Sequence, residues 1–139
     1  MAVTPPIRHF LDELEGLLDS KDWPGLDRTA VTVTSIHAAA RVELPHRKPD
    51  GLGIELEVHD QTVKVIYWPE HVTFTRRDEA LKFVEMLGDG RVVLVVRRSP
   101  VWTSLQSFRD NLALPFRKTS EPWLNLKFRT ERCHFGFID

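Results

Sequence analysis

The chain has 139 residues, of which 42% are hydrophobic and 28% charged, a composition that can build a core and that excludes a disordered or fibrous protein. Its formal net charge of −1 argues against a generally basic nucleic-acid-binding protein. This sum hides an asymmetry, because residues 1–90 carry 10 basic and 16 acidic side chains, whereas residues 91–139 carry 9 and 4.

A helix is predicted from Pro5 to about Ser20. Proline is well suited to a first helical position, where its missing N–H would have no partner in any case, and Thr4 before it can act as the N-cap. Apolar residues then recur at helical spacing from Ile7 to Leu18, with acidic residues between them. The helix is therefore amphipathic and should cover another layer of the protein.

Residues 29–44 indicate one long strand. Its apolar residues change parity between Val33 and Ile36, which predicts a β-bulge near Thr34–Ser35. Further strands are expected at residues 52–58, 62–68 and 72–75, because apolar and polar residues alternate there between groups of turn residues.

A second helix is predicted to begin at Thr75, whose spacing to Asp78 is that of a capping box, and to end near Gly88. Residues 91–98 follow as a strand that is buried on both faces, since their apolar run does not alternate. Residues 101–108 fit either a strand or the start of a helix. Residues 109–122 are expected to form a loop, and residues 123–129 and 132–138 two further strands.

This order of elements predicts a single α+β domain over residues 1–139. We expect a mainly antiparallel sheet with the N-terminal helix and the central helix packed on one face. In its order of elements the chain resembles small bacterial chaperone-type and toxin-immunity proteins. A likeness at the level of fold does not determine function, which depends on particular sites.

Glu55, Glu57 and His59 form the most site-like group, because a period of two places all three on one face of a strand. If residues 29–44 pair with that strand, His37, Arg41 and Glu43 stand nearby. Such a face suits a metal-dependent hydrolase or nuclease. The alternation equally describes the solvated side of a half-exposed sheet, which we favour, and we assign no metal ligand, catalytic residue or cofactor.

Pro49-Asp50 together with Glu55-x-Glu57 resembles a degenerate PD-(D/E)xK nuclease pattern. The match fails because Glu57 stands where a lysine should be, and because Asp50 and Glu55 are only five residues apart. Lys64 across the next turn would have to substitute for the missing lysine in space.

The last third of the chain combines basic and aromatic residues, among them Arg97, Arg98, Trp102 and Trp123. Basic groups beside aromatic rings are typical of single-strand nucleic-acid binding, which is our second alternative. The balanced total charge disfavours it. Arginine and tryptophan also anchor protein interfaces, and this interpretation ranks ahead.

We therefore expect a non-enzymatic protein-binding domain, of the immunity type or the chaperone type. Its binding residues are predicted to be Glu43, Glu55, Glu57, His59, Arg97, Arg98, Trp102 and Trp123. The partner is a protein, and a second copy is one option because the acidic part of one chain can meet the basic part of another.

We also expect a cytoplasmic location without membrane contact. The single Cys133 suits a reducing compartment, and residues 1–6 lack the pattern of a secretion signal. The longest apolar run, Val92–Val96, is too short to span a bilayer.

Overall fold

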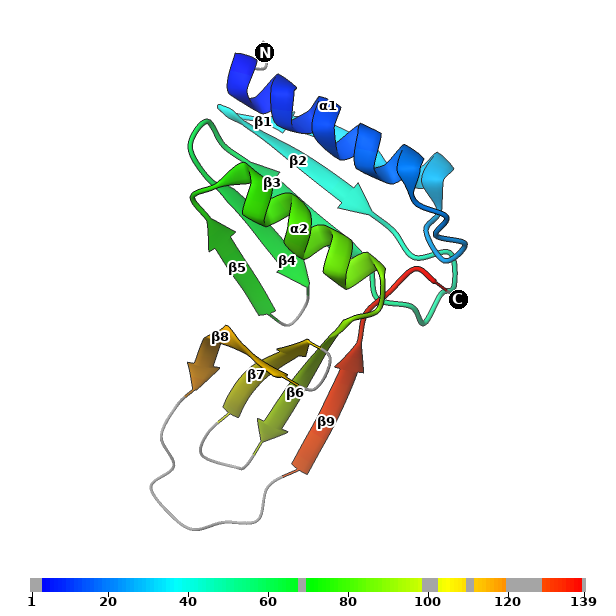
Figure 1. Ribbon diagram of the computed structural model, residues 1–139, viewed down its shortest axis with the longest axis vertical. Coiled ribbons are helices and arrows are strands. Elements are labelled where there is room, and N and C mark those ends of the chain that lie inside the picture. Colours follow the sequence, from blue (N-terminus) through cyan, green and yellow to red (C-terminus); the bar gives the residue numbers. More distant parts are fainter. Residues whose placement is uncertain (1–3, 68–69, 99–102, 110–111, 120–128, 139) are drawn as a thin grey trace.

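The computed structural model describes residues 4–67, 70–98, 103–109, 112–119 and 129–138 (Figure 1). Its elements in chain order are α1 (Pro5–Ser20), a 3₁₀ turn η1 (Arg28–Ala30), β1 (Thr32–Ile36), β2 (Ala39–Leu44), β3 (Ile54–Val58), β4 (Val63–Tyr67), β5 (Glu70–Phe74), α2 (Arg77–Gly88), β6 (Val92–Arg98), β7 (Thr103–Arg109), β8 (Leu112–Thr119) and β9 (Arg129–His134).

Strands β1 to β5 form an antiparallel sheet in chain order, and Figure 1 shows both helices in front of it. Alternate residues of the central strands are buried, for example Leu56 on β3 and Val65 on β4, and they share one core with the buried residues of the helices. The α+β class predicted from the sequence is therefore confirmed.

Helix α1 buries one stripe of its surface. Thr4 is the N-cap and Pro5 the first helical residue, as predicted, but the Thr4 hydroxyl donates to the carboxylate of Asp60 instead of capping the helix. Ile7, Phe10, Leu14 and Leu18 are buried against the sheet. Each such side chain stabilises the fold by about 1.5–3 kcal/mol relative to an exposed one.

The predicted bulge at Thr34–Ser35 is wrong. The chain reverses instead, because β1 and β2 form a hairpin in which Ile36 pairs with Ala39 across a two-residue turn. His37 in this turn has a φ of 53°, the left-handed region that few non-glycine residues adopt. A turn of this kind changes the parity of the apolar residues just as a bulge does.

Helix α2 begins at Arg77, and no side-chain hydrogen bond caps it, so the predicted capping box at Thr75 is wrong. Asp78 and Glu79 in its first turn suit the positive end of the helix dipole. Ala80, Phe83, Val84 and Leu87 face the core. The chain leaves the helix through Gly90, whose φ is 74°.

The strands after α2 form a sheet of their own, in the order β8-β7-β6-β9, all antiparallel. The predicted strand at 91–98 is β6, and β7 decides the 101–108 alternative in favour of a strand. The predicted loop at 109–122 is wrong where the structure describes it, since β8 covers Leu112–Thr119. The last strand lies at Arg129–His134 rather than 132–138. The strand predicted at 123–129 lies outside the described residues except for Arg129.

Aromatic side chains from the C-terminal segment join the core. Phe135 contacts Tyr67 edge-on at 5.3 Å between ring centroids, and Phe137 lies 5.6 Å from Trp23. Both phenylalanines are buried. Phe137 also exchanges backbone hydrogen bonds with Gly88 and Gly25, which fix the segment beside α2. Among the described residues, no helix is long and apolar enough to cross a membrane.

Candidate functional site

The face of the five-stranded sheet turned away from the helices is the candidate site, and we call it the outer face. Paired residues of antiparallel strands share a face, so it follows from the register. Every one of its side chains is exposed or half-buried. It comprises Thr32, Thr34 and Ile36 of β1, Ala39, Arg41 and Glu43 of β2, Glu55 and Glu57 of β3, Lys64 and Ile66 of β4, and His71 and Thr73 of β5. His59 continues it beyond the end of β3.

Two of the three predicted glutamates on the outer face, Glu55 and Glu57, lie within ion-pair distance of basic side chains. The Arg41 Nε contacts a carboxylate oxygen of Glu55 on the neighbouring strand. Glu57 lies 3.8 Å from the Lys64 Nζ and 3.9 Å from the Nε2 of His59, which is charged only when protonated. Lys64 thus does stand beside Glu57 in space. These pairs place basic side chains beside the carboxylates that a divalent metal would need, which disfavours a metal site here.

Glu43 differs from the other two. It stands directly opposite Glu55 in the β2–β3 register, and its carboxylate accepts only a 3.5 Å hydrogen bond from the Thr32 hydroxyl. Within the described residues, no cation lies within ion-pair distance of it. Like charges directly opposite on adjacent strands destabilise a sheet.

A hollow of about 250 Å³ lies beside these two residues, and we call it the acidic notch. Glu43 and Glu55 line it together with Ile66 of β4, Gly53, Leu44, Pro45 and Ile54. A Cβ at Gly53 would approach the carbonyl oxygen of Leu44 to 2.8 Å, so glycine allows the two segments to come this close. The lining of the notch thus combines two glutamates, whose carboxylate oxygens accept hydrogen bonds, with mainly apolar residues.

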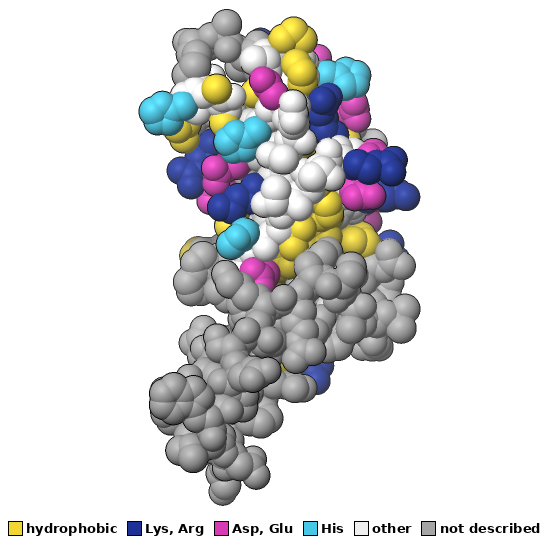
Figure 2. Space-filling model, turned by 90° about the vertical axis from the view of Figure 1, so that its left-hand side faces the viewer, with side chains coloured by type: hydrophobic (Ala, Val, Ile, Leu, Met, Phe, Trp, Pro, Cys, Tyr) yellow, Lys and Arg dark blue, Asp and Glu magenta, His cyan; other side chains and the backbone are white. Residues whose placement is uncertain are grey.

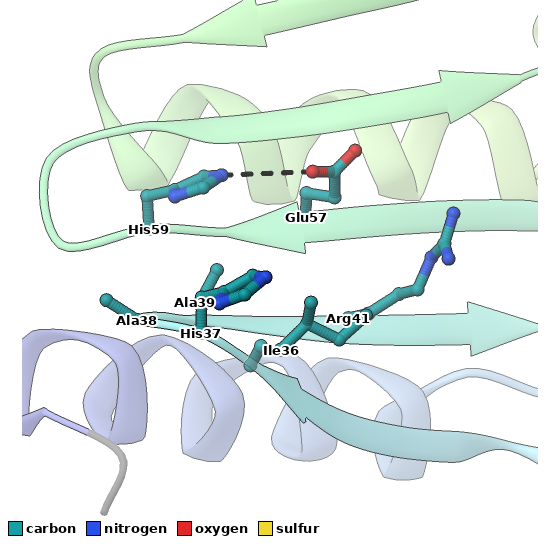
Figure 3. Close-up of a pocket in the computed structure, with 8 residues that line it drawn as sticks. Ile36, His37, Ala38, Ala39, Arg41, Glu57 and His59 are labelled. Atoms are coloured by element: carbon teal, nitrogen blue, oxygen red, sulfur yellow. Dashed lines mark ion pairs between the residues drawn. The ribbon is translucent and has the colours of Figure 1, made fainter. Parts of the chain in front are cut away.

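A second hollow, of about 410 Å³, lies at the other end of the outer face, beside the β1–β2 turn. Figure 3 shows Glu57 and His59 across from Arg41 and the turn residue His37. Ile36 and Ala38, Ala39 and Ala40 of the same hairpin also line the hollow. The grouping of these side chains predicted from strand parity is therefore present. Within the described residues, no set of three His, Cys, Asp or Glu is arranged to hold a metal.

The remaining predicted site residues do not join this group. Arg97 and Arg98 lie on β6 of the second sheet, where Arg97 pairs with Ser104 and Thr130. Trp102 and Trp123 lie outside the described residues. On the side of the molecule shown in Figure 2, basic, acidic and histidine side chains alternate among the described residues without a large patch of one charge.

A third hollow, of about 530 Å³, is a feature that sequence reasoning missed. It lies between the loop before β3 and the last strand, and is lined by His46, Lys48 and Asp50 from the loop and by Arg132, Cys133 and His134 from β9. About 85 residues separate the two segments, and no motif links them. Asp50 therefore belongs to this hollow, away from Glu55 and Glu57.

No protein-family model, curated protein or solved structure matches this chain. The arrangement of side chains on the outer face is therefore the basis on which a function can be proposed.

Proposed function

We propose that this chain is a non-enzymatic protein-binding domain, and that the acidic notch on its outer face receives a lysine or arginine of the partner protein. The observation that supports it is the juxtaposition of Glu43 and Glu55, in which no basic side chain among the described residues pairs with Glu43. A locally unfavourable arrangement, here two carboxylates side by side, is expected at functional sites.

The shape of the notch suits a long basic side chain. Its aliphatic stem would pack on Ile66, while its charged head would lie between the two carboxylates. The surroundings support the same partner, because residues 1–90 carry a net charge of −6 that attracts a basic surface from a distance. Glu55 would then share its negative charge between Arg41 and the partner.

This proposal is favoured over the metal-dependent hydrolase, because Arg41, Lys64 and His59 already accompany Glu55 and Glu57. It is also favoured over nucleic-acid binding. Phe135 and Phe137, two of the aromatic residues in the basic third, are 5% and 0% exposed and cannot stack on bases.

The test is affinity capture from the source cells with the purified chain as bait, in three versions: the natural chain, Glu43→Lys and Glu15→Lys. Glu15 is exposed on α1, so its replacement makes the same change in charge away from the outer face. A stoichiometric partner should be retained by the natural chain and by Glu15→Lys, and lost with Glu43→Lys. The identified partner is then purified and its affinity measured at rising salt, where it should weaken.

The free energy of unfolding shows whether Glu43 serves partner binding or the stability of the fold. Glu43→Gln removes the repulsion from Glu55, so the free energy of unfolding should rise by roughly 0.5 kcal/mol while partner binding weakens. The proposal is wrong if no stoichiometric partner is recovered, or if Glu43→Lys captures the same protein as the natural chain.

A further inference from the structure

Strand β1 is an edge strand with both faces open to solvent. All five of its residues are exposed, including Val33 at 56% and Ile36 at 40%. Its backbone pairs with β2 on one side, and within the described residues no backbone hydrogen bond reaches Thr32–Ile36 from any other segment. The row of N–H and C=O groups on its free side is therefore a template for another strand.

Sheet edges in folded proteins are usually protected by charges, proline, bulges or inward-pointing ionisable residues. The other three edge strands follow this rule. On β5, Glu70 is buried in the protein. The sequences of the other two edge strands contain proline or charged residues, which are Pro115, Arg117 and Lys118 in β8 and Arg129, Glu131 and Arg132 in β9. By contrast, β1 has the sequence Thr-Val-Thr-Ser-Ile and an unbroken register with β2. Among the four edge strands of the described sheets, β1 is the one whose sequence contains neither a charged residue nor a proline.

We propose that β1 pairs antiparallel with β1 of a second copy of this chain, around a two-fold axis at Thr34. The backbone geometry allows this register. Ile36 and Ala39 close a two-residue hairpin and so exchange hydrogen bonds, and these bonds alternate along the pair. Val33 and Ser35 consequently direct their N–H and C=O groups away from β2.

In the two-fold register, Val33 of one copy stands opposite Ser35 of the other, so the outward groups meet in about four hydrogen bonds. Ile36 stands opposite Thr32 of the second copy, and the two Thr34 residues face each other. Val33 and Ile36, which are exposed in the single chain, are then partly covered by these neighbouring side chains.

The chemistry of the strand selects a second copy over a charged partner. Because β1 has no charged residue, no like charges meet when it pairs with itself. A basic segment, which the acidic notch suits, would find no counter-charge on β1. The inference does not depend on the notch, since Glu43 lies one strand away from the edge.

Disulfide cross-linking tests the register. The two Thr34 Cα atoms would lie about 4.5 Å apart, as in a pair that is not hydrogen-bonded, which a disulfide can bridge. Thr34→Cys should give a covalent dimer under mild oxidation. Thr73→Cys is the matched control, because Thr73 is an exposed threonine on β5 at the opposite edge of the same face. The natural chain, whose only cysteine is Cys133, reports any background.

The mass in solution tests the dimer itself. By sedimentation or light scattering, we expect a dimer that persists in about 0.5 M salt, since it is held by backbone hydrogen bonds and apolar contacts. Thr34→Lys places two ammonium groups face to face and should weaken dimerisation by about tenfold, with the helical and strand content unchanged. Thr73→Lys should have no effect.

Three results would overturn the inference: a monomer at all concentrations, a dimer that dissociates in salt, or a Thr34→Cys chain that cross-links no better than Thr73→Cys. The second result would indicate contact between the acidic and basic parts of two chains. Failure of the acidic notch is seen separately, because Glu43→Lys should lose the partner and keep the dimer mass.

Discussion

His37 is the residue on which the β1–β2 hairpin turns, and its φ of 53° is unfavourable for most side chains. Asparagine tolerates this conformation, whereas a β-branched residue does not. We expect His37→Asn to keep or slightly raise the free energy of unfolding, and His37→Val to lower it by roughly 1–2 kcal/mol. Denaturation in urea measures both. Equal stability of the two variants would show that the turn does not need the left-handed conformation.

The sequence predicts that the candidate site residues share one face of the sheet, but it does not predict which of them are neighbours across strands. Glu55, Glu57 and His59 alternate along one strand, so the period of two placed them together. That Glu43 stands opposite Glu55 depends on the length and path of the loop between β2 and β3, and neither residue's local sequence contains this information. The sequence does not reveal the hairpin at His37, because the turn lacks the Asn-Gly or Asp-Gly pair of common two-residue turns.

At the scale of the elements, two glycines in the helices have opposite roles. A Cβ at Gly16 in α1 would meet nothing within 4 Å, whereas one at Gly88 at the end of α2 would lie 2.3 Å from the Trp23 ring. The Trp23 ring is held there, because its Nε1 donates a 2.9 Å hydrogen bond to Asp89.

We therefore expect Gly16→Ala to stabilise the protein by roughly 0.5–1 kcal/mol, since alanine costs less backbone entropy in an exposed helix. Gly88→Ala should destabilise it by roughly 1–3 kcal/mol through overpacking against Trp23. Thermal unfolding of both variants gives the comparison. A neutral Gly88→Ala would mean that the indole can move aside without losing its bond to Asp89.

The elements were predictable where one periodicity extends over a whole segment, as in α1 and β3, and not where several weak signals compete. The sequence predicts a loop over residues 109–122, but β8 lies within this range and contains Pro115, and proline is tolerated in a strand only at an edge. Only the sheet order shows that β8 is at such an edge. The division of the strands into two sheets is likewise set by long-range pairing, which local sequence does not encode.

At the scale of the whole molecule, the charge asymmetry of the sequence follows the architecture. The net charge of −6 belongs to residues 1–90, which contain both helices and the five-stranded sheet, and the +5 belongs to residues 91–139, which contain the second sheet. The change of sign thus coincides with the exit of the chain from α2 through Gly90. The acidic part carries the notch, where we propose that a basic side chain of the partner binds.

Tyr67 joins the two sheets. Its hydroxyl lies 2.9 Å from the hydroxyl of Ser107 on β7, and both residues are buried. Burial raises the pKa of Tyr67 to about 12, because the neutral phenol is favoured in the core, although the Ser107 hydrogen bond opposes this shift. Tyr67 is the only tyrosine of the chain, so the absorbance of tyrosinate reports this group alone.

The raised pKa of Tyr67 makes the free energy of unfolding depend on pH in the alkaline range. Below about pH 10, the phenol is neutral in the folded and the unfolded chain, and its full contribution is present. Above that pH only the unfolded chain loses the proton, so stability falls until the folded pKa of about 12 is reached. The slope due to Tyr67 is at most about 1.4 kcal/mol per pH unit.

We predict that Tyr67→Phe lowers the free energy of unfolding at neutral pH by about 1 kcal/mol, through loss of the hydroxyl's hydrogen bond. The free energy of unfolding of Tyr67→Phe should also decline less steeply from pH 10 to 12 than that of the natural chain. Because both proteins contain the same lysines, the comparison removes the effect of lysine titration. Urea denaturation across this range, together with a spectrophotometric titration of the natural chain, measures the two effects. A tyrosinate transition near pH 10 in the folded protein would show that Tyr67 is open to solvent and that the two sheets do not close over it.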